Sequence, residues 1–292
     1  MIYDIRQTTT YTYASKVAYA QHLLRLTPID RTRQRVHVAS LEIDPSPPER
    51  REGQDFFGNR LTWIAFDEPH DRLTIKVAAR VTVDPPGELP PRDTPPWEAV
   101  RDEAFTSSDI GPMSPVHFLF PSRQVSLDPE IHEYVRESFP PGRPVLDGAL
   151  EVMRRIKADF IYEIGATTVS TTPPMSFALR RGVCQDFAHI MISGLRGIGL
   201  PAAYVSGYLR TAQGPHDVSL QGADAMHAWV MVWCGADAGW YGLDPTNAVV
   251  AGLDHVVLAI GRDYSDVSPL DGVVFGSGRQ KLDTAVSVSP VG

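Results

Sequence analysis

Three proline pairs divide the chain into two parts that must fold differently. The pairs are Pro85-Pro86, Pro90-Pro91 and Pro95-Pro96. Proline fixes φ and donates no backbone hydrogen bond, so neither a regular helix nor a central strand can run through this interval. We therefore assign residues 86–125 to a proline-rich linker and connecting segment. It separates an N-terminal β-rich domain, residues 1–85, from a core, residues 126–292.

The N-terminal part reads as a series of β-strands. Threonine, tyrosine and β-branched residues are frequent in it, and Gly58-Asn59 provides a turn signal. In the last stretch, Leu73, Ile75 and Val77 alternate with polar residues, which is the period of a half-buried strand. The expected strands are Ile2–Tyr13, Val17–Leu26, Val36–Ile43, Phe57–Phe66 and Leu73–Val83. Short strands at this spacing predict an antiparallel β-domain, either sandwich-like or a small barrel.

Helical patterns begin after the linker. Ser126–Phe139 has an N-cap residue at Asp128 and a proline directly after it. Val145–Ile161 repeats apolar residues at helical spacing, whereas the Thr- and Pro-rich interval Gly165–Pro174 predicts a loop. Further strand patterns follow, so the whole chain predicts an α+β fold.

The net charge of the chain argues against two classes of binding partner. The 292 residues carry a formal net charge of -8, and the pI is about 5.6. An acidic chain repels phosphate groups, so we expect neither nucleic acid nor an anionic membrane as a partner. The densest basic group, Arg31, Arg33 and Arg35, is short and predicts a solvated strand edge.

Cysteine usage and hydropathy indicate a cytoplasmic protein. Two cysteines, Cys184 and Cys234, are too few for a disulfide framework or a four-cysteine zinc site. Met1–Tyr13 lacks the apolar stretch of a signal peptide, and no interval approaches the ~18 apolar residues of a membrane span. His216 and Asp217 alone do not make a metal site, and no calcium-loop spacing occurs, so we predict no metal and no cofactor.

The strongest chemical feature is a cysteine at the start of a helix. The apolar stripe of this helix consists of Phe187, Met191, Leu195 and Ile198. Cys184 lies in or just before the first turn, where unpaired backbone N–H groups and the helix dipole stabilise a thiolate. A buried structural cysteine is the alternative, and position alone favours it, so the assignment depends on partner residues.

Two further residues complete a candidate triad. The strand pattern 225–233 places His227 on one face and directs Cys234 to the other, where we expect it to be a small core residue. The return strand Trp240–Asp244 brings Asp244 to the face of His227 if the intervening loop has an even number of residues. A loop of 234–237 would place the two side chains directly opposite each other, and a loop of 234–239 would place them diagonally. His227 would then take the thiol proton, and Asp244 would orient the imidazole.

These stretches together resemble the bacterial transglutaminase-like family. They are GVCQDFAH (Gly182–His189), GYL (Gly207–Leu209), GADAMHAW (Gly222–Trp229), GWYGLDPTN (Gly239–Asn247) and GRDYSDVSPLDG (Gly261–Gly272). HLLRLTP (His22–Pro28) and FFGNR (Phe56–Arg60) resemble the β-domain that precedes the core in many such proteins. The resemblance implies a papain-like core whose nucleophile helix packs on an antiparallel sheet. It also implies Cys184 as nucleophile, His227 as base and Asp244 as third member. Met226 stands where a small residue is expected.

The triad defines the first half-reaction but not the acceptor. Attack on a carbonyl forms a thioester. Water then makes the protein a protease or amidase, while an amine makes it a cross-linking transglutaminase. We favour hydrolysis of an amide or peptide bond in a protein or peptide substrate, because water needs no second binding site. A catalytically silent binding module with the same fold is the remaining alternative.

Several other residues receive supporting roles. Asp186 is interpreted as a favourable charge in the first helical turn, and His189 as a packed helix residue. Asp263 and Tyr264 are interpreted as structural support near the site. The Cys184 N–H is one oxyanion donor, and a second is sought in 167–172. The polar interval 211–225 is predicted to form a substrate rim or lid.

Overall fold

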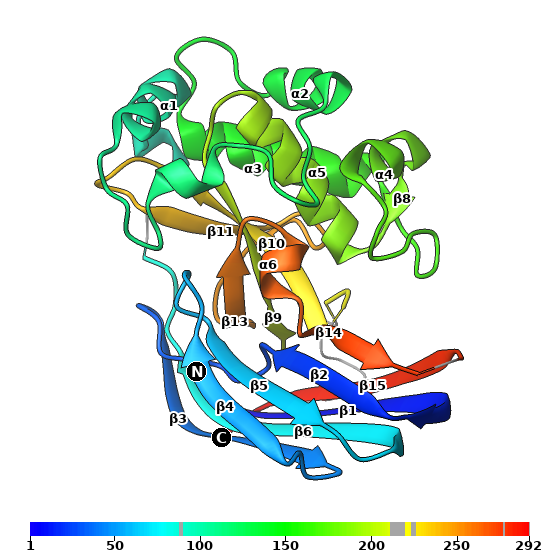
Figure 1. The fold of residues 1–292 in the computed structure, drawn as a ribbon. Coiled ribbons are helices and arrows are strands. Elements are labelled where there is room, and N and C mark those ends of the chain that lie inside the picture. Colours follow the sequence, from blue (N-terminus) through cyan, green and yellow to red (C-terminus); the bar gives the residue numbers. More distant parts are fainter. Residues whose placement is uncertain (88–89, 211–219, 223–225, 277, 292) are drawn as a thin grey trace.

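The protein consists of a core, in which helices pack on a sheet, and a β-sandwich below that sheet (Figure 1). The computed structural model describes residues 1–292 except 88–89, 211–219, 223–225, 277 and 292. Helices cover one face of a five-stranded sheet in the upper part of Figure 1, and two four-stranded sheets lie below it. The paired strands of the three larger sheets are antiparallel, so the predicted α+β fold with its sandwich-like β-domain is confirmed.

The lower part is a β-sandwich. One sheet has the order β15-β1-β6-β3 and the other β14-β2-β5-β4. The strands from the N-terminal part are β1 (Ile2–Val17), β2 (Tyr19–Leu24), β3 (Gln34–Asp44), β4 (Glu49–Gln54), β5 (Arg60–Phe66) and β6 (His70–Val83). Leu73, Ile75 and Val77 of β6 point inward and pack with Ile64 and Phe66 of β5. This alternation is the one visible in the sequence, because a strand with one solvated face must alternate.

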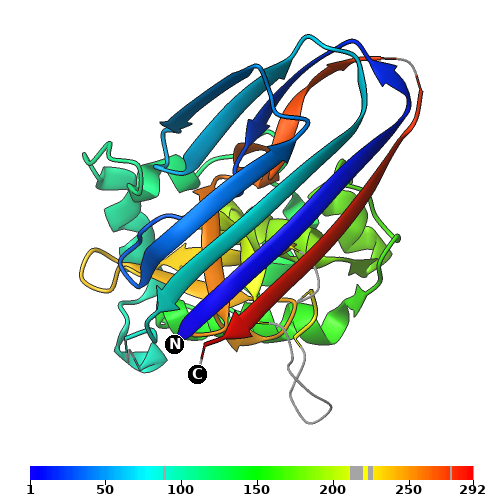
Figure 2. The same ribbon diagram turned by 90° about the horizontal axis from the view of Figure 1, so that it is seen from below.

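The last strands of the chain return to this sandwich, which differs from the predicted division at residue 126. They are β14 (Leu270–Phe275) and β15 (Gln280–Pro290). Figure 2 shows β15 alongside β1, with the two chain ends adjacent, and Tyr3 is paired with Pro290. Most side chains of β15 are exposed, so its sequence shows little of the apolar alternation that would have assigned it to a sandwich.

The interval 86–125 is also different from the predicted linker, because part of it folds into the core. It contains η1 (Pro91–Asp93), α1 (Trp97–Thr106) and η2 (Pro115–Phe118). Trp97, Val100 and Ala104 of α1 are buried in the main hydrophobic cluster. Pro96 is the N-cap residue of α1, where the missing N–H breaks no helical hydrogen bond. The proline pairs therefore do not exclude helices from this interval. They lie at the ends of short helices instead.

The core sheet has the order β12-β11-β10-β9-β13. Its strands are β9 (Ala202–Leu209), β10 (Met226–Trp233), β11 (Trp240–Asp244), β12 (Val249–Val250) and β13 (His255–Gly261). The helices above it are α2 (Pro129–Arg136), α3 (Val145–Asp159), α4 (Pro173–Leu179), α5 (Cys184–Gly197) and the short α6 (Tyr264–Val267). Two-residue strands β7 (Ile161–Tyr162) and β8 (Arg181–Gly182) pair in parallel just before α5. Helix α5 packs directly on β9 and β10 and is buried from Gln185 to Arg196.

Two amide side chains from the sandwich part join it to the edge strand β13. Gln34 donates to the carbonyl oxygen of Val257 and accepts from its N–H, both at 2.8 Å. Asn59 makes the same pair of contacts with Ile260, again at 2.8 Å. A free sheet edge carries unpaired backbone groups, and these amides satisfy them as a neighbouring strand would. The turn signal at Asn59 thus marks an interdomain contact as well as a turn.

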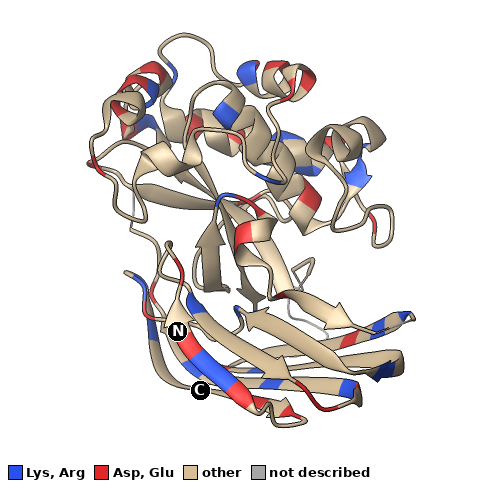
Figure 3. Cartoon of the chain, viewed as in Figure 1, with Lys and Arg blue, Asp and Glu red and all other residues tan. Residues whose placement is uncertain are grey.

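Charged residues of both signs are interspersed along the strands and helices (Figure 3). On β4, for example, Arg50 and Glu52 form a pair at 2.8 Å. Within the described residues, no helix is both long and apolar enough to cross a bilayer.

Candidate active site

Cys184 is the first residue of α5 and is partly exposed. The Asp186 carboxylate, in the first turn, accepts hydrogen bonds from the Val183 N–H at 2.8 Å and from the Thr167 hydroxyl at 2.6 Å. A Cβ built on Gly182 would lie 2.6 Å from an Asp186 oxygen, so only glycine leaves room for this contact. Asp186 therefore acts as a local anchor for the start of the helix, more specifically than the predicted dipole charge.

His227 and Asp244 form a buried pair below the helix. In the β10–β11 hairpin Trp233 is opposite Trp240, so the loop is 234–239 and the two side chains are diagonal neighbours. Nε2 of His227 donates to Oδ2 of Asp244 at 2.9 Å, and neither side chain is exposed. Of the alternatives left open by the sequence, the structure has the six-residue loop.

Asp244 is held by more groups than the sequence indicated. Its Oδ1 accepts from the backbone N–H groups of Thr246 at 2.9 Å and Asn247 at 3.2 Å. Its Oδ2 accepts from the Asn247 side chain at 2.8 Å and from Nε2 of His255 at 3.3 Å. Burial acts to raise the pKa of Asp244, but His227 and then His255 outweigh it, so this carboxyl is ionised well below its ordinary range.

His255 and Asn247 are site residues that the sequence analysis missed. Asn247 is the last residue of the GWYGLDPTN stretch, three positions after Asp244, so its place in a tight turn after the strand was a usable signal. His255 is on β13, at the other edge of the sheet order, and nothing in its local sequence indicates that it reaches Asp244. Only the folded sheet brings the two together.

The electrostatics of His227 connect it to Cys184. Burial acts to lower the pKa of His227, but Asp244 and then Cys184 outweigh it and raise this pKa to about 10. Nε2 is used by Asp244, so the buried Nδ1 is the nitrogen that can exchange a proton with Cys184. A Cβ built on Gly222 would lie 2.7 Å from this Nδ1, which shows how closely the chain passes over the imidazole. The arrangement suits transfer of a proton between a thiol and the imidazole.

Three phenol side chains interact electrostatically with Cys184. Burial is the main cause of the raised pKa of Tyr162, which is about 12, and Cys184 is the next. The same two causes, in the same order, raise the pKa of Tyr204 well above its ordinary value. For Tyr264, burial again raises the pKa, with Cys184 as a smaller contributor. The raised pKa values keep these tyrosines protonated at neutral pH, so they add no charge near the nucleophile.

The strand tryptophans belong mainly to the core. Trp229 is buried and stacks on His227 with a centroid distance of 6.2 Å, and Trp233 packs among the helices. Cys234 is fully buried, and burial raises its pKa to about 12. The prediction that Cys234 is a small core residue is confirmed by this burial.

The loop 167–172 gives no clear second oxyanion donor. Thr167 is used by Asp186, and the carbonyl of Val169 accepts from the Gln185 side chain at 3.1 Å. Most of the predicted lid at 211–225, together with His216 and Asp217, lies outside the described residues. Gln221, which is described, donates its N–H to Asn247 at 2.9 Å. In the part of the chain that the structure describes, no three His, Cys, Asp or Glu side chains converge as metal ligands.

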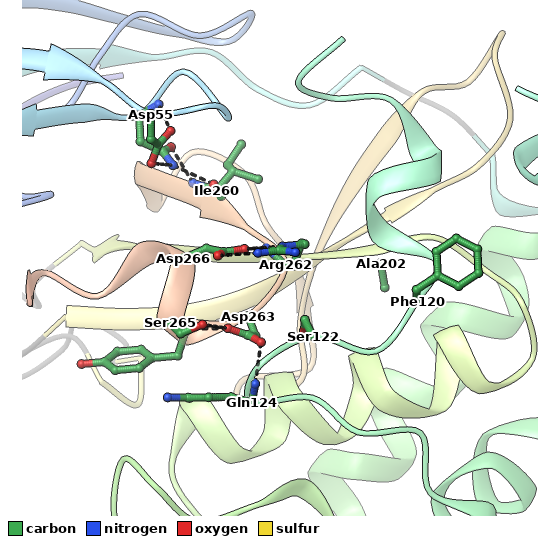
Figure 4. Close-up of polar contacts among 12 residues, drawn as sticks. Asp55, Phe120, Ser122, Gln124, Ala202, Ile260, Arg262, Asp263, Ser265 and Asp266 are labelled. Atoms are coloured by element: carbon green, nitrogen blue, oxygen red, sulfur yellow. Dashed lines mark hydrogen bonds and ion pairs between the residues drawn. The ribbon is translucent and has the colours of Figure 1, made fainter. Parts of the chain in front are cut away.

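A polar network fixes the rest of α5 and α6. Asp263 accepts from the N–H groups of Gln124 at 2.7 Å and Ser265 at 2.8 Å (Figure 4). Nε2 of His189 accepts from the Tyr264 N–H at 3.2 Å, and burial lowers the pKa of His189 to about 4, which keeps this nitrogen unprotonated. The network joins α5 to α6 and to the segment before α2, consistent with the packing and support roles expected for these residues.

The comparisons with known proteins match both parts of the chain. Residues 3–82 match the family model of the bacterial transglutaminase-like N-terminal region. Residues 133–245 match that of the transglutaminase-like superfamily. The second interval contains Cys184, His227 and Asp244.

Whole-chain relatives extend this similarity. The chain is 37% identical to the uncharacterized protein Rv2569c of Mycobacterium tuberculosis, over 99% of this chain and 92% of that protein. It is 30% identical to the uncharacterized protein ML0607 of Mycobacterium leprae, over 96% of each. Among solved structures, a protein of Cytophaga hutchinsonii described as a candidate cysteine protease has a TM-score of 0.73 and 22% identity. That match covers 99% of this chain and 90% of the other and shows a shared fold.

Proposed function

Because this chain belongs to the transglutaminase-like superfamily, we propose that it is an enzyme in which Cys184 attacks the carbonyl of an amide or peptide bond. The observation that carries the proposal is the arrangement around His227. A partly exposed cysteine at a helix start lies near a buried imidazole, which in turn donates to a buried carboxylate at 2.9 Å. Such an arrangement activates a thiol. Burial of the charged pair costs desolvation free energy, and perturbed pKa values of this kind are typical of functional sites.

In the proposed resting state the Cys184 thiol proton already resides on Nδ1 of His227, because the raised pKa of about 10 keeps this imidazole protonated at neutral pH. The thiolate adds to the substrate carbonyl, and the negative oxygen accepts a hydrogen bond from the Cys184 backbone N–H. His227 returns the proton to the leaving amine as the C–N bond breaks, which leaves an acyl thioester on Cys184. Asp244 holds the imidazole in orientation through Nε2 and stabilises its positive charge.

We propose water as the acceptor that releases the acyl group. His227 takes a proton from this water, the new C–O bond forms, and Cys184 leaves as the thiolate. Partial exposure of Cys184 supports access of solvent and of an extended chain, so the proposed substrate is a protein or peptide. The Cytophaga protein described as a candidate cysteine protease is consistent with this reaction type.

The test combines labelling with product analysis. Wild type and Cys184→Ala are incubated with a peptide library in ¹⁸O-water, with and without a labelled primary amine, and products are read by mass spectrometry. We expect products with ¹⁸O in the new carboxylate from wild type only. Transfer of the amine without ¹⁸O uptake would identify an acyltransferase instead. A Cys184 that reacts with iodoacetamide no faster than the buried Cys234 would contradict both and favour a binding module.

We also propose a cytoplasmic location, because both cysteines are free and the mechanism requires a reduced Cys184. Fractionation of cells that express a tagged chain tests this. Recovery from the periplasmic or extracellular fraction would contradict it.

A further inference from the structure

A cavity of about 450 Å³ lies where the core sheet meets the sandwich, apart from the nucleophile. Trp229 and Met231 of β10 line it, and the alternate residues Val230 and Val232 pack with the helices on the other face. Neither Cys184 nor His227 lines the cavity. Its volume is within the range of small-molecule sites.

The guanidinium of Arg31, which lines this cavity, is partly buried and is not paired with a carboxylate among the described residues. Its Nη2 donates to Asn59 at 2.8 Å and its Nη1 to the carbonyl oxygen of Phe57 at 3.5 Å, while its Nε is buried without an acceptor among the described residues. Burial lowers the pKa of Arg31, and only the more remote Asp55, which pairs with Arg25 at 3.4 Å, acts against this. Arg31 is thus a partly desolvated guanidinium without a carboxylate of its own within the described residues, and not the solvated edge residue that the sequence predicted.

Two indole side chains lie in the wall of the cavity. Trp229 is only 2% exposed, and its Nε1 lies 3.6 Å from the position of a Cβ built on Gly242, which lines the same cavity. The indole N–H of Trp240 donates to the carbonyl oxygen of Met113 at 3.0 Å. These rings give the wall a largely aromatic surface.

The charged side chains that line the cavity favour an anion. Among the described residues, Arg31 and Arg33 line it and Asp84 is the only carboxylate that does, so positive charge is in excess there. A guanidinium binds a carboxylate through paired hydrogen bonds, and Arg31 has more N–H donors than its contacts with Asn59 and Phe57 use. The other walls are aromatic and aliphatic and would hold an apolar body.

We propose that this cavity is a binding site for a small organic acid that has an aromatic or branched apolar body and a carboxylate. The carboxylate contacts Arg31, and the body packs against Trp229 and Met231. His255 lines the same cavity and donates to Asp244, so the occupant lies one residue away from the proposed triad. The site itself does not depend on the chemistry proposed for Cys184.

The test uses 1-naphthylacetate and its neutral amide, 1-naphthylacetamide, in calorimetric titrations of the intact chain. We expect one site for the acid with a Kd below about 1 mM, and at least ~10-fold weaker binding of the amide. Arg31→Gln should weaken acid binding by a similar factor and leave amide binding unchanged. Arg35→Gln, an exposed neighbour that does not line the cavity, is the matched control and should change neither.

A second variant protects the test against misfolding of Arg31→Gln. Met231→Glu places a carboxylate in the cavity wall and should abolish acid binding while the circular dichroism spectrum is retained. The proposal is overturned if the acid does not saturate a site by 10-fold above the expected Kd, or if acid and amide bind equally. Binding that is unchanged in folded Arg31→Gln and in Met231→Glu would overturn it as well.

Discussion

Replacement of Asp244 by asparagine should remove the positive charge of His227 at neutral pH. The pKa of His227 is about 10, against an ordinary value of 6.5, and the difference corresponds to roughly 5 kcal/mol in favour of the charged ring. Burial opposes this charge, and Asp244 is the largest contributor that favours it. Asparagine keeps the shape and can still accept from Thr246, but it carries no charge. We therefore expect the pKa of His227 to fall below about 7.

The loss of the imidazolium should also slow reactions of Cys184. An ordinary thiol is about 1% ionised at pH 6.5, while a thiolate paired with an imidazolium persists there but is less nucleophilic. Combining the two effects, we expect alkylation of Cys184 at pH 6.5 to be about 10-fold slower in Asp244→Asn.

Two measurements check this reasoning. Carbon-13 labelling of the histidine ring gives the pKa of His227 by NMR titration from pH 5 to 11, and mass spectrometry follows iodoacetamide labelling of Cys184. Asp263→Asn is the matched control, because it also removes a buried carboxylate from the core but does not contact His227. If wild-type His227 titrates near 6.5, or if its pKa stays near 10 in Asp244→Asn, the electrostatic argument is refuted.

Three more predictions concern the supports of the site and the sandwich. Gly182→Ala should displace Asp186 from the Val183 N–H, lower stability by roughly 1 kcal/mol and slow alkylation of Cys184, measured by urea unfolding and labelling. Asn59→Ala should leave both backbone groups of Ile260 unpaired and lower the free energy of unfolding in urea by roughly 3 kcal/mol. A decrease below about 1 kcal/mol would show that the Asn59 amide does not stabilise the edge of β13. Burial and then His70 lower the pKa of His22 to about 4. As pH falls, His22 is therefore protonated in the unfolded chain before it is protonated in the folded chain, which favours unfolding. Stability should therefore drop by roughly 3 kcal/mol between pH 6.5 and 4, and less in His22→Leu.

The His22 prediction has an internal check. Both ring nitrogens of His22 are buried without hydrogen-bond partners among the described residues, so His22→Leu should also be no less stable than wild type at pH 7. A variant that is less stable at pH 7 and equally sensitive to acid would show that the neutral ring is not the cause.

The local patterns of the sequence were sufficient for several features. The apolar stripe predicted α5, with Cys184 in or just before its first turn, because a helix packed on a sheet must bury one face continuously. The return strand Trp240–Asp244 has the bounds expected from its flanking turn and proline. The α+β fold followed from the change of period along the chain.

Contacts distant in sequence could not be predicted in this way. His255 reaches Asp244 from β13, and β15 pairs with β1 across almost the whole chain, yet neither is marked by a local pattern. Arg31 looked like a solvated charge because burial of a side chain depends on what packs over it.

The sequence by itself therefore determined α5, the β10–β11 hairpin, most of the N-terminal strands, and the identities of the nucleophile, base and carboxylate candidates, because helix stripes and strand alternation are set by neighbours in the chain. The tertiary structure alone decided which hairpin loop aligns His227 with Asp244, which further groups hold that carboxylate, and where a cavity with an unpaired cation remains. The physical reason is that strand register, desolvation and hydrogen-bond partners arise between segments far apart in the chain. Their free energies depend on the assembled surroundings and not on the residues adjacent in sequence.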